Sequence, residues 1–244
     1  MHWVHETVSD GVVERQFELQ GGSRPVPGLL WVPAEAVGPR PLLLLGHGAS
    51  GTKREGYLVA LARRMVRRHG FAAAAIDGPV HGDRRPDLGS NPVLTFLEFS
   101  QAWTTDPAMT DAMVADWRST IDELEKLDEV GSGPVGYWGL SMGTILGLPL
   151  VAAEPRIAAA VLGLMGMTGP TRERIAADAP RVRCPVLFLL QWDDELFARD
   201  SSIELFGALG SSDKRLHAQP GRHGEVPSEE FEASDRFLTR HLTD

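Results

Sequence analysis

Short apolar runs recur along the chain, separated by longer segments in which apolar residues return every three or four positions. The runs are typical of strands, and the spaced segments are typical of amphipathic helices. The pattern predicts strands at 12–19, 26–32, 41–45, 71–76, 135–140, 158–163, 186–190 and 215–218. It predicts helices at 55–69, 109–127, 142 onward, 203–209 and 231–242.

The order of these elements defines a fold class. Two opening strands are joined by a turn at Gly21-Gly22, and strand and helix then alternate to the end of the chain. Such an order favours an α/β fold with a mostly parallel central sheet of about eight strands and helices on both faces. A length of 244 residues without a linker-like tract suits a single domain over 1–244. Functional residues are then expected beyond the carboxyl ends of the strands.

The segment from Arg84 to Pro107 is long for a plain connection between a strand and the next helix. If a short helix follows Pro92, Phe96 and Phe99 share one face at i, i+3 spacing. Two interpretations stay open. The segment is either a small cap, in which Phe96, Phe99 and Trp103 line a pocket, or an extra helix packed on the body.

Composition narrows the class of partner. The hydrophobic fraction of 43% and the charged fraction of 23% are ordinary for a globular protein, and the formal net charge is −9. An acidic chain lacks the basic stripe that a nucleic-acid partner needs. The arginines between Arg63 and Arg68 are expected on the outer face of a helix whose Leu58, Leu61, Ala62 and Met65 face inward.

Cysteine and the apolar stretches restrict the compartment. Cys184 is the single cysteine, so no internal disulfide forms, and its place before an apolar run predicts a strand start rather than a nucleophile. The stretch from Ile145 to Met167 contains Pro149 and a charged break, which argues against a membrane span. No long apolar stretch follows Met1, so we expect no signal peptide and a cytoplasmic protein without a membrane partner.

Gly139-Leu140-Ser141-Met142-Gly143 matches the G-x-S-x-G pattern. A sharp turn from strand to helix needs this pattern, because side chains two positions either side of the serine would collide. The serine hydroxyl is then exposed at a helix N-terminus, where developing negative charge is favoured. A predicted strand before the motif and a helix after it make Ser141 a candidate nucleophile; an idle serine in a glycine-rich turn is the alternative.

With this motif and this order of elements, the sequence resembles the α/β-hydrolase superfamily over nearly its whole length. The resemblance is greatest to the small serine esterases and the dienelactone-hydrolase-like members. The run from Gly46 to Gly51 follows the third predicted strand, where this family keeps its oxyanion loop. The resemblance implies that the backbone N–H groups of Ala49 and Met142 hold the oxyanion of a tetrahedral intermediate. The side chains of His47 and His81 are expected to shape loops rather than to react.

The resemblance also implies an acid after the strand that ends at Leu190. In relatives the acid is the aspartate three residues after the position held here by Gln191, which selects Asp194. Asp193 is the close alternative, and Asp200 is a distant one.

The base is expected in the last loop before the closing helix, and His223 is the only histidine of that loop. His217 lies in the preceding predicted strand, and His241 lies near the end of the final helix. Placing the base at His223 completes the order Ser…Asp…His of this family. A neutral imidazole there accepts the serine proton while the aspartate fixes its tautomer.

Some positions depart from the family pattern. Thr144 stands where many relatives have a second glycine, and Pro149 interrupts the predicted helix. The region 167–182, where many relatives insert a lid, is short. A serine occupies position 141 instead of the cysteine of true dienelactone hydrolases.

The residues and the resemblance together predict a carboxylesterase that acts through an acyl-enzyme on small to medium acyl esters. The same residues serve a thioester, a lactone, or an amide or peptide bond, and a non-catalytic binding protein on this fold is a further alternative. The expected partner is a small-molecule ester. No metal site and no cofactor are expected, because the sequence lacks paired Cys/His spacing, a dinucleotide fingerprint and a P-loop.

Overall fold

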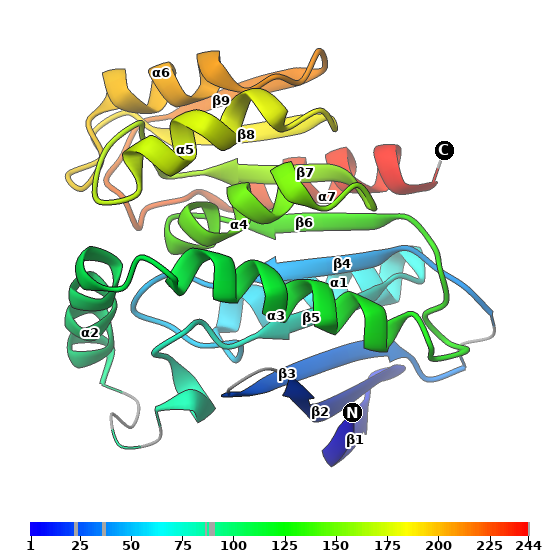
Figure 1. Ribbon diagram of the computed structural model, residues 1–244. Helices are drawn as coiled ribbons and strands as arrows, with labels where there is room; N and C mark the ends of the chain where they lie inside the picture. Colours follow the sequence, from blue (N-terminus) through cyan, green and yellow to red (C-terminus); the bar gives the residue numbers. More distant parts are fainter. Residues whose placement is uncertain (22–23, 36–37, 86, 88–90, 244) are drawn as a thin grey trace. The chain divides into compact units, whose positions relative to one another are not determined.

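The computed structural model describes residues 1–21, 24–35, 38–85, 87 and 91–243. Nine strands and seven α-helices lie within these residues (Figure 1). The chain forms two compact units, Met1–Val135 and Gly136–Asp244. The predicted turn at Gly21-Gly22 falls partly outside the described residues, because Gly22 is not among them.

The first unit contains five strands and three α-helices. The strands are β1 (His2–Ser9), β2 (Val12–Gly21), β3 (Arg24–Pro33), β4 (Leu42–Gly46) and β5 (Ala72–Ile76). They lie in the order β1-β2-β3-β5-β4, antiparallel except for the parallel pair β4 and β5. The helices are α1 (Gly56–His69), α2 (Pro92–Thr105) and α3 (Met109–Leu124). The core of this unit is formed by β3, β4 and β5, whose apolar side chains are buried.

Helix α1 illustrates how closely the apolar pattern predicts local structure. Its buried residues are Leu58, Leu61, Ala62, Met65 and Val66, so the inward face is the predicted one. The arginines at 67 and 68 are exposed and lie in the last turn, where a cation interacts favourably with the helix dipole. Gly70 ends the helix at φ 68°, a left-handed conformation that glycine adopts without steric cost.

Strand β1 was not predicted. All eight of its residues are exposed, so it carries none of the apolar alternation that marks a half-buried strand. It pairs with β2 as an antiparallel edge strand, and its stability therefore depends on backbone hydrogen bonds and cross-strand pairs. This strand brings the total to nine, against the predicted eight or so.

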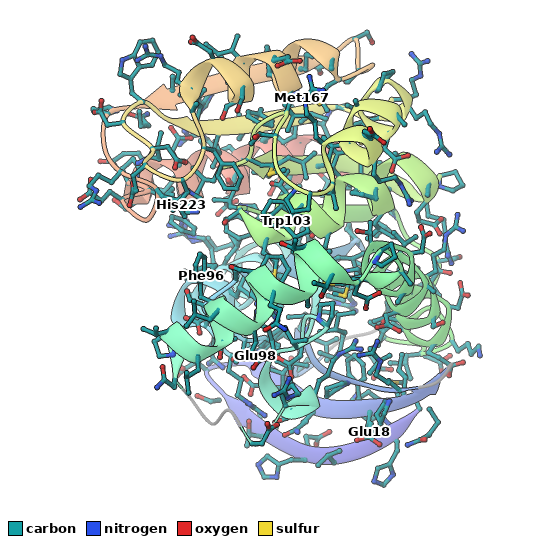
Figure 2. The ribbon with its side chains drawn as sticks, turned by 60° about the vertical axis from the view of Figure 1, so that its left-hand side comes forward. Glu18, Phe96, Glu98, Trp103, Met167 and His223 are labelled. Carbon is teal, nitrogen blue, oxygen red and sulfur yellow. The ribbon has the colours of Figure 1, made fainter. Side chains whose placement is uncertain are left out.

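Helix α2 occupies most of the segment 84–107. Pro92 stands at its start, and the Asn91 side chain accepts the N–H groups of Val93 and Leu94 at 3.1 and 3.2 Å, which is a typical N-cap. Phe96 is 40% exposed and Phe99 is 2% exposed, so the two rings do not share an environment at i, i+3. Phe96 and Trp103 are labelled on this helix in Figure 2.

The second unit contains strands β6 (Val135–Gly139, beginning at the boundary), β7 (Ile157–Gly163), β8 (Val186–Gln191) and β9 (Lys214–Gln219). They lie in the order β6-β7-β8-β9, and β7, β8 and β9 are parallel. Its helices are α4 (Met142–Ala153), α5 (Arg172–Asp178), α6 (Arg199–Ala208) and α7 (Ser228–Thr243). Helices α4 and α7 both pack on β7, from opposite faces (Figure 1).

Two details of this unit differ from the sequence-based expectation. The prediction that Pro149 interrupts the helix is wrong, because α4 continues through it to Ala153. Proline removes one backbone hydrogen bond, but every residue from Met142 to Val151 is buried, so packing holds the helix in place. Helix α5, in the short region 167–182, was not predicted either.

Across the described part of the chain, no helix combines the length and the apolar character needed to cross a bilayer.

Candidate active site

Ser141 lies at the turn between β6 and α4, where its backbone adopts φ 59° and ψ −120°. A positive φ is uncommon for a residue other than glycine and marks local strain. Gly139, two residues before Ser141, must lack a side chain, because a Cβ there would lie 2.9 Å from the carbonyl oxygen of Gly143. The turn therefore has the geometry that the G-x-S-x-G pattern predicts.

Two buried hydroxyl groups fasten this turn. The Tyr137 hydroxyl donates to the carbonyl of Gly143 at 2.6 Å. The Thr144 hydroxyl accepts the N–H of Gly163 at 2.8 Å and lies 2.8 and 2.7 Å from the carbonyl oxygens of Gly139 and Gly163. Thr144 replaces a second glycine of the family pattern, and here it joins the elbow to the end of β7.

The side chains of Asp194, His223 and Ser141 form one hydrogen-bonded chain. His223 Nδ1 lies 2.8 Å from Asp194 Oδ2, and His223 Nε2 lies 2.9 Å from Ser141 Oγ. An ionised carboxylate only accepts, so Nδ1 carries the proton and Nε2 of the neutral ring is free to accept the serine proton. This arrangement can act as nucleophile, general base and orienting acid.

The surroundings of Asp194 favour its ionised form. Burial by itself would raise the pKa of this carboxyl, but hydrogen bonds outweigh that effect and hold its pKa below the usual value. One bond comes from His223, and Oδ1 accepts the N–H groups of Leu196 and Phe197 at 2.8 and 3.0 Å. Phe197 also lies against the His223 ring, with 5.7 Å between ring centroids.

The other candidates for the acid and the other histidines near the C-terminus make different contacts. Asp193 is exposed, and its backbone N–H donates to Gly221 O, in the loop of His223, at 3.1 Å. Asp200 lies in the first turn of α6. His217 Nδ1 lies 2.8 Å from Glu230 Oε2, and His241 Nε2 lies 3.6 Å from Asp213 Oδ2.

Met142 is the first residue of α4, and the N–H groups of a helix's first turn have no partner within the helix. Its N–H therefore needs no partner within the helix, which is compatible with the oxyanion role expected of it from the sequence. The other expected donor, Ala49, and the residues Phe96, Phe99 and Trp103 belong to the first unit.

Within the first unit, two buried histidines hold the loop of Ala49. His47 Nε2 accepts the N–H of Gly78 at 2.8 Å, so Nδ1 carries the proton and donates to Gly48 O at 2.8 Å. His81 Nε2 donates to Ala49 O at 2.9 Å. The carbonyl of Gly48 and the carbonyl of Ala49 therefore each accept an imidazole N–H.

A buried ion pair, which sequence reasoning missed, fixes the same loop. Lys53 is 1% exposed and Asp77 is fully buried, and their side chains form a salt bridge. Asp77 also accepts the N–H groups of Lys53 and Asp83, both at 3.0 Å. A lysine behind a glycine-rich turn is usually exposed, and the sequence pattern offers no sign that this one is not.

Cys184 is a poorer candidate for a nucleophile than Ser141. Burial raises the pKa of the Cys184 thiol to about 12, so the thiol is inert at neutral pH. In the part of the chain that the structure describes, no three His, Cys, Asp or Glu side chains are grouped as metal ligands would be.

The chain is similar to known esterases and hydrolases. No protein-family model matches the chain. The PEG-bound structure of a cold-adapted esterase from an Arctic intertidal metagenomic library is 42% identical, with a TM-score of 0.89 over 99% of this chain and 100% of that one. Dienelactone hydrolase from Anabaena variabilis shares the fold at 18% identity, with a TM-score of 0.69 over 95% of this chain and 99% of that one.

A curated protein also matches. The 2,6-dihydropseudooxynicotine hydrolase of Paenarthrobacter nicotinovorans is 27% identical over 157 residues, which are 64% of this chain and 33% of that protein. The match thus spans about a third of the length of the curated relative. The chain belongs to the α/β-hydrolase superfamily, and the predicted fold class and the assignment to the hydrolases are confirmed.

The geometry predicts that Asp194, and not Asp193, orients His223. Asp194→Asn should lower kcat by orders of magnitude, about 10⁴ in the best-studied triad, because the amide no longer selects the Nδ1–H tautomer. Asp193→Asn should leave steady-state kinetics on a p-nitrophenyl ester nearly unchanged. The reverse ranking would move the acid by one residue.

The buried His81 predicts a loss of stability in acid. Burial, aided by the nearby His47, lowers the pKa of His81 to about 3, against about 6.5 in an unfolded chain. Because only the unfolded state binds this proton between those values, the contribution is complete above about pH 6.5 and is lost as the pH falls. Between pH 7 and pH 5 the free energy of unfolding should fall by about 2 kcal/mol on this account.

His81→Gln isolates this contribution, because a glutamine amide can still donate to Ala49 O but does not titrate. Urea unfolding of both proteins at pH 7 and pH 5 should show a fall about 2 kcal/mol smaller in the variant. Equal falls would show that His81 is not held neutral by its surroundings.

Proposed function

We propose that the protein is a carboxylic ester hydrolase that works through an acyl-enzyme on Ser141. The observation that carries this proposal is the hydrogen-bonded chain from Asp194 through His223 to a serine held at positive φ at a helix N-terminus. The 42% identity with a cold-adapted esterase over the full length of that chain supports an ester as the bond that is cleaved.

In this mechanism Ser141 Oγ attacks the ester carbonyl while His223 Nε2 takes its proton. The negative charge moves to the carbonyl oxygen, which accepts the N–H of Met142 and, as the family resemblance implies, the N–H of Ala49. Collapse of the tetrahedral intermediate expels the alcohol, which receives the proton from His223. Water, deprotonated by the same histidine, then releases the acid and restores the serine.

The proposed substrates are esters with small to medium acyl groups. The apolar lining rests on the expectation that the segment 84–107 forms a cap. Within the first unit, helix α2 of that segment exposes large apolar side chains: Val93, Leu94, Phe96 and Leu97. Phe99 is buried against Trp103, with ring centroids 6.0 Å apart, so its part in the lining is to hold the Trp103 ring. Apolar walls beside a few polar catalytic groups are usual for small-molecule sites.

Replacement of the nucleophile is the direct test of this function. Ser141→Ala should lower kcat/KM for p-nitrophenyl acetate by roughly 10³ to 10⁶, while the circular dichroism spectrum and thermal unfolding stay close to those of the wild-type protein. Thioesters, lactones and peptides assayed beside the esters should be poorer substrates. Wild-type activity in the variant would end the proposal, and a better peptide or thioester would change the bond assigned.

Chain-length preference tests the proposed lining. Each methylene that enters an apolar pocket should add about 0.8 kcal/mol of transition-state binding, so log kcat/KM should rise with acyl length and then turn over early. Phe96→Ala and Trp103→Ala should shift the length at which it turns over and keep hydrolysis of the acetate ester. Gln101→Ala, at an exposed polar position of the same helix outside the proposed lining, is the control. Unchanged preference in both variants would make α2 a packing element.

A further inference from the structure

The loops that carry the candidate acid and base are joined residue by residue within the second unit. Strands β8 and β9 pair in parallel as far as Gln191 and Gln219. Beyond that pair, Trp192 N donates to Gln219 O at 2.7 Å and Asp193 N donates to Gly221 O at 3.1 Å. The backbone ladder then ends, two residues before His223.

Side chains continue where the backbone ladder ends. Gln191 is 3% exposed, and its amide nitrogen donates to the carbonyls of Arg222 and Glu225 at 3.2 and 2.8 Å. These carbonyls lie on either side of His223 along the chain. Gly221, at φ 122°, leaves room for this approach, because a Cβ there would lie 3.1 Å from the amide nitrogen.

Glu195 holds the backbone of His223 itself. Its Oε2 accepts the N–H of His223 at 2.9 Å, and this bond holds the pKa of Glu195 below its usual value. Arg222 Nη2 lies 3.4 Å from Oε1 of the same carboxylate. His223 is therefore fastened at its backbone by Glu195 and at its ring by Asp194, two adjacent residues.

From these contacts we infer that Gln191 and Glu195 are positioning residues for His223. Resting on the proposed function, the inference is that they fix the backbone from which the imidazole reaches both Asp194 Oδ2 and Ser141 Oγ. Once that backbone is fixed, only the two side-chain torsions of the histidine remain to be set. A displacement of about 1 Å in such a group costs on the order of 10²-fold in rate.

The chemistry of each side chain follows from its role. Gln191 faces two carbonyl oxygens, and its amide nitrogen has two N–H groups, so it can donate one to each. A carboxylate of the same shape has no N–H to offer and would be repelled. Glu195 faces an N–H group, so either a carboxylate or an amide oxygen can accept it.

The experiment compares five single variants in the full-length protein. They are Gln191→Glu, Gln191→Ala, Glu195→Ala, Glu195→Gln and Asp193→Asn. The last is the matched control, because the exposed Asp193 stands between the two positions and reaches the His223 loop through its backbone. For each variant we would measure kcat and KM for p-nitrophenyl acetate, the pH profile of kcat/KM, and the fraction of serine labelled by a fluorophosphonate.

Positioning predicts losses in kcat with KM nearly unchanged. Gln191→Glu should lower kcat by about 10²-fold and Gln191→Ala by somewhat less, and both should shift the acid limb of the pH profile. Glu195→Ala should lower kcat by roughly 10-fold, and Glu195→Gln should recover most of it because the amide oxygen still accepts the N–H. Asp193→Asn should match the wild-type protein.

The outcomes separate this inference from the proposed function. If the variants lose thermal stability but keep kcat per labelled serine and the wild-type pH profile, the two side chains are merely structural and the inference is overturned. An Asp193→Asn variant as impaired as Glu195→Ala would also overturn it. If Gln191→Glu does not fold, the Glu195 pair decides. Activity that survives Ser141→Ala would instead remove the proposed function.

Discussion

The turn at Ser141 is the constraint on which the candidate site depends. A positive φ at a serine is unfavourable on its own, and the surroundings must therefore hold it. The Ser141 N–H donates to Gly163 O at 3.0 Å, and the buried hydroxyls of Tyr137 and Thr144 fasten the residues on either side. Helix α4, buried on all sides, fixes the direction in which the chain leaves the turn.

The partners of Ser141 reach it through the order of the strands. Asp194 and His223 are 29 residues apart in the chain, but they follow β8 and β9, which are neighbours and run in parallel. Their carboxyl ends therefore deliver both loops to one place. Beyond the strands, regular backbone pairing ends, and hydrogen bonds from the side chains of Gln191 and Glu195 connect the two loops.

The sequence predicts most of these elements because buried faces place apolar residues at regular intervals along the chain. The continuous apolar runs of β4, β5 and β8 and the inward face of α1 follow from this rule, and the glycines of the elbow reveal the turn. Strand β1 is fully exposed and α5 is short, so neither shows a regular pattern of apolar residues. The opposite environments of Phe96 and Phe99, and the clamp by Gln191, depend on tertiary packing that spacing alone does not encode.

The central claim is that Ser141 carries the acyl group between two chemical steps. Rapid mixing of the protein with excess p-nitrophenyl acetate, followed by acid quench and peptide mass mapping, tests this most directly. The account predicts a burst of p-nitrophenol close to one equivalent when deacylation is the slower step, and an added acetyl group on the peptide that contains Ser141. An acetyl group on another residue, or turnover without any covalent acyl-protein when deacylation is slowed, would contradict the account.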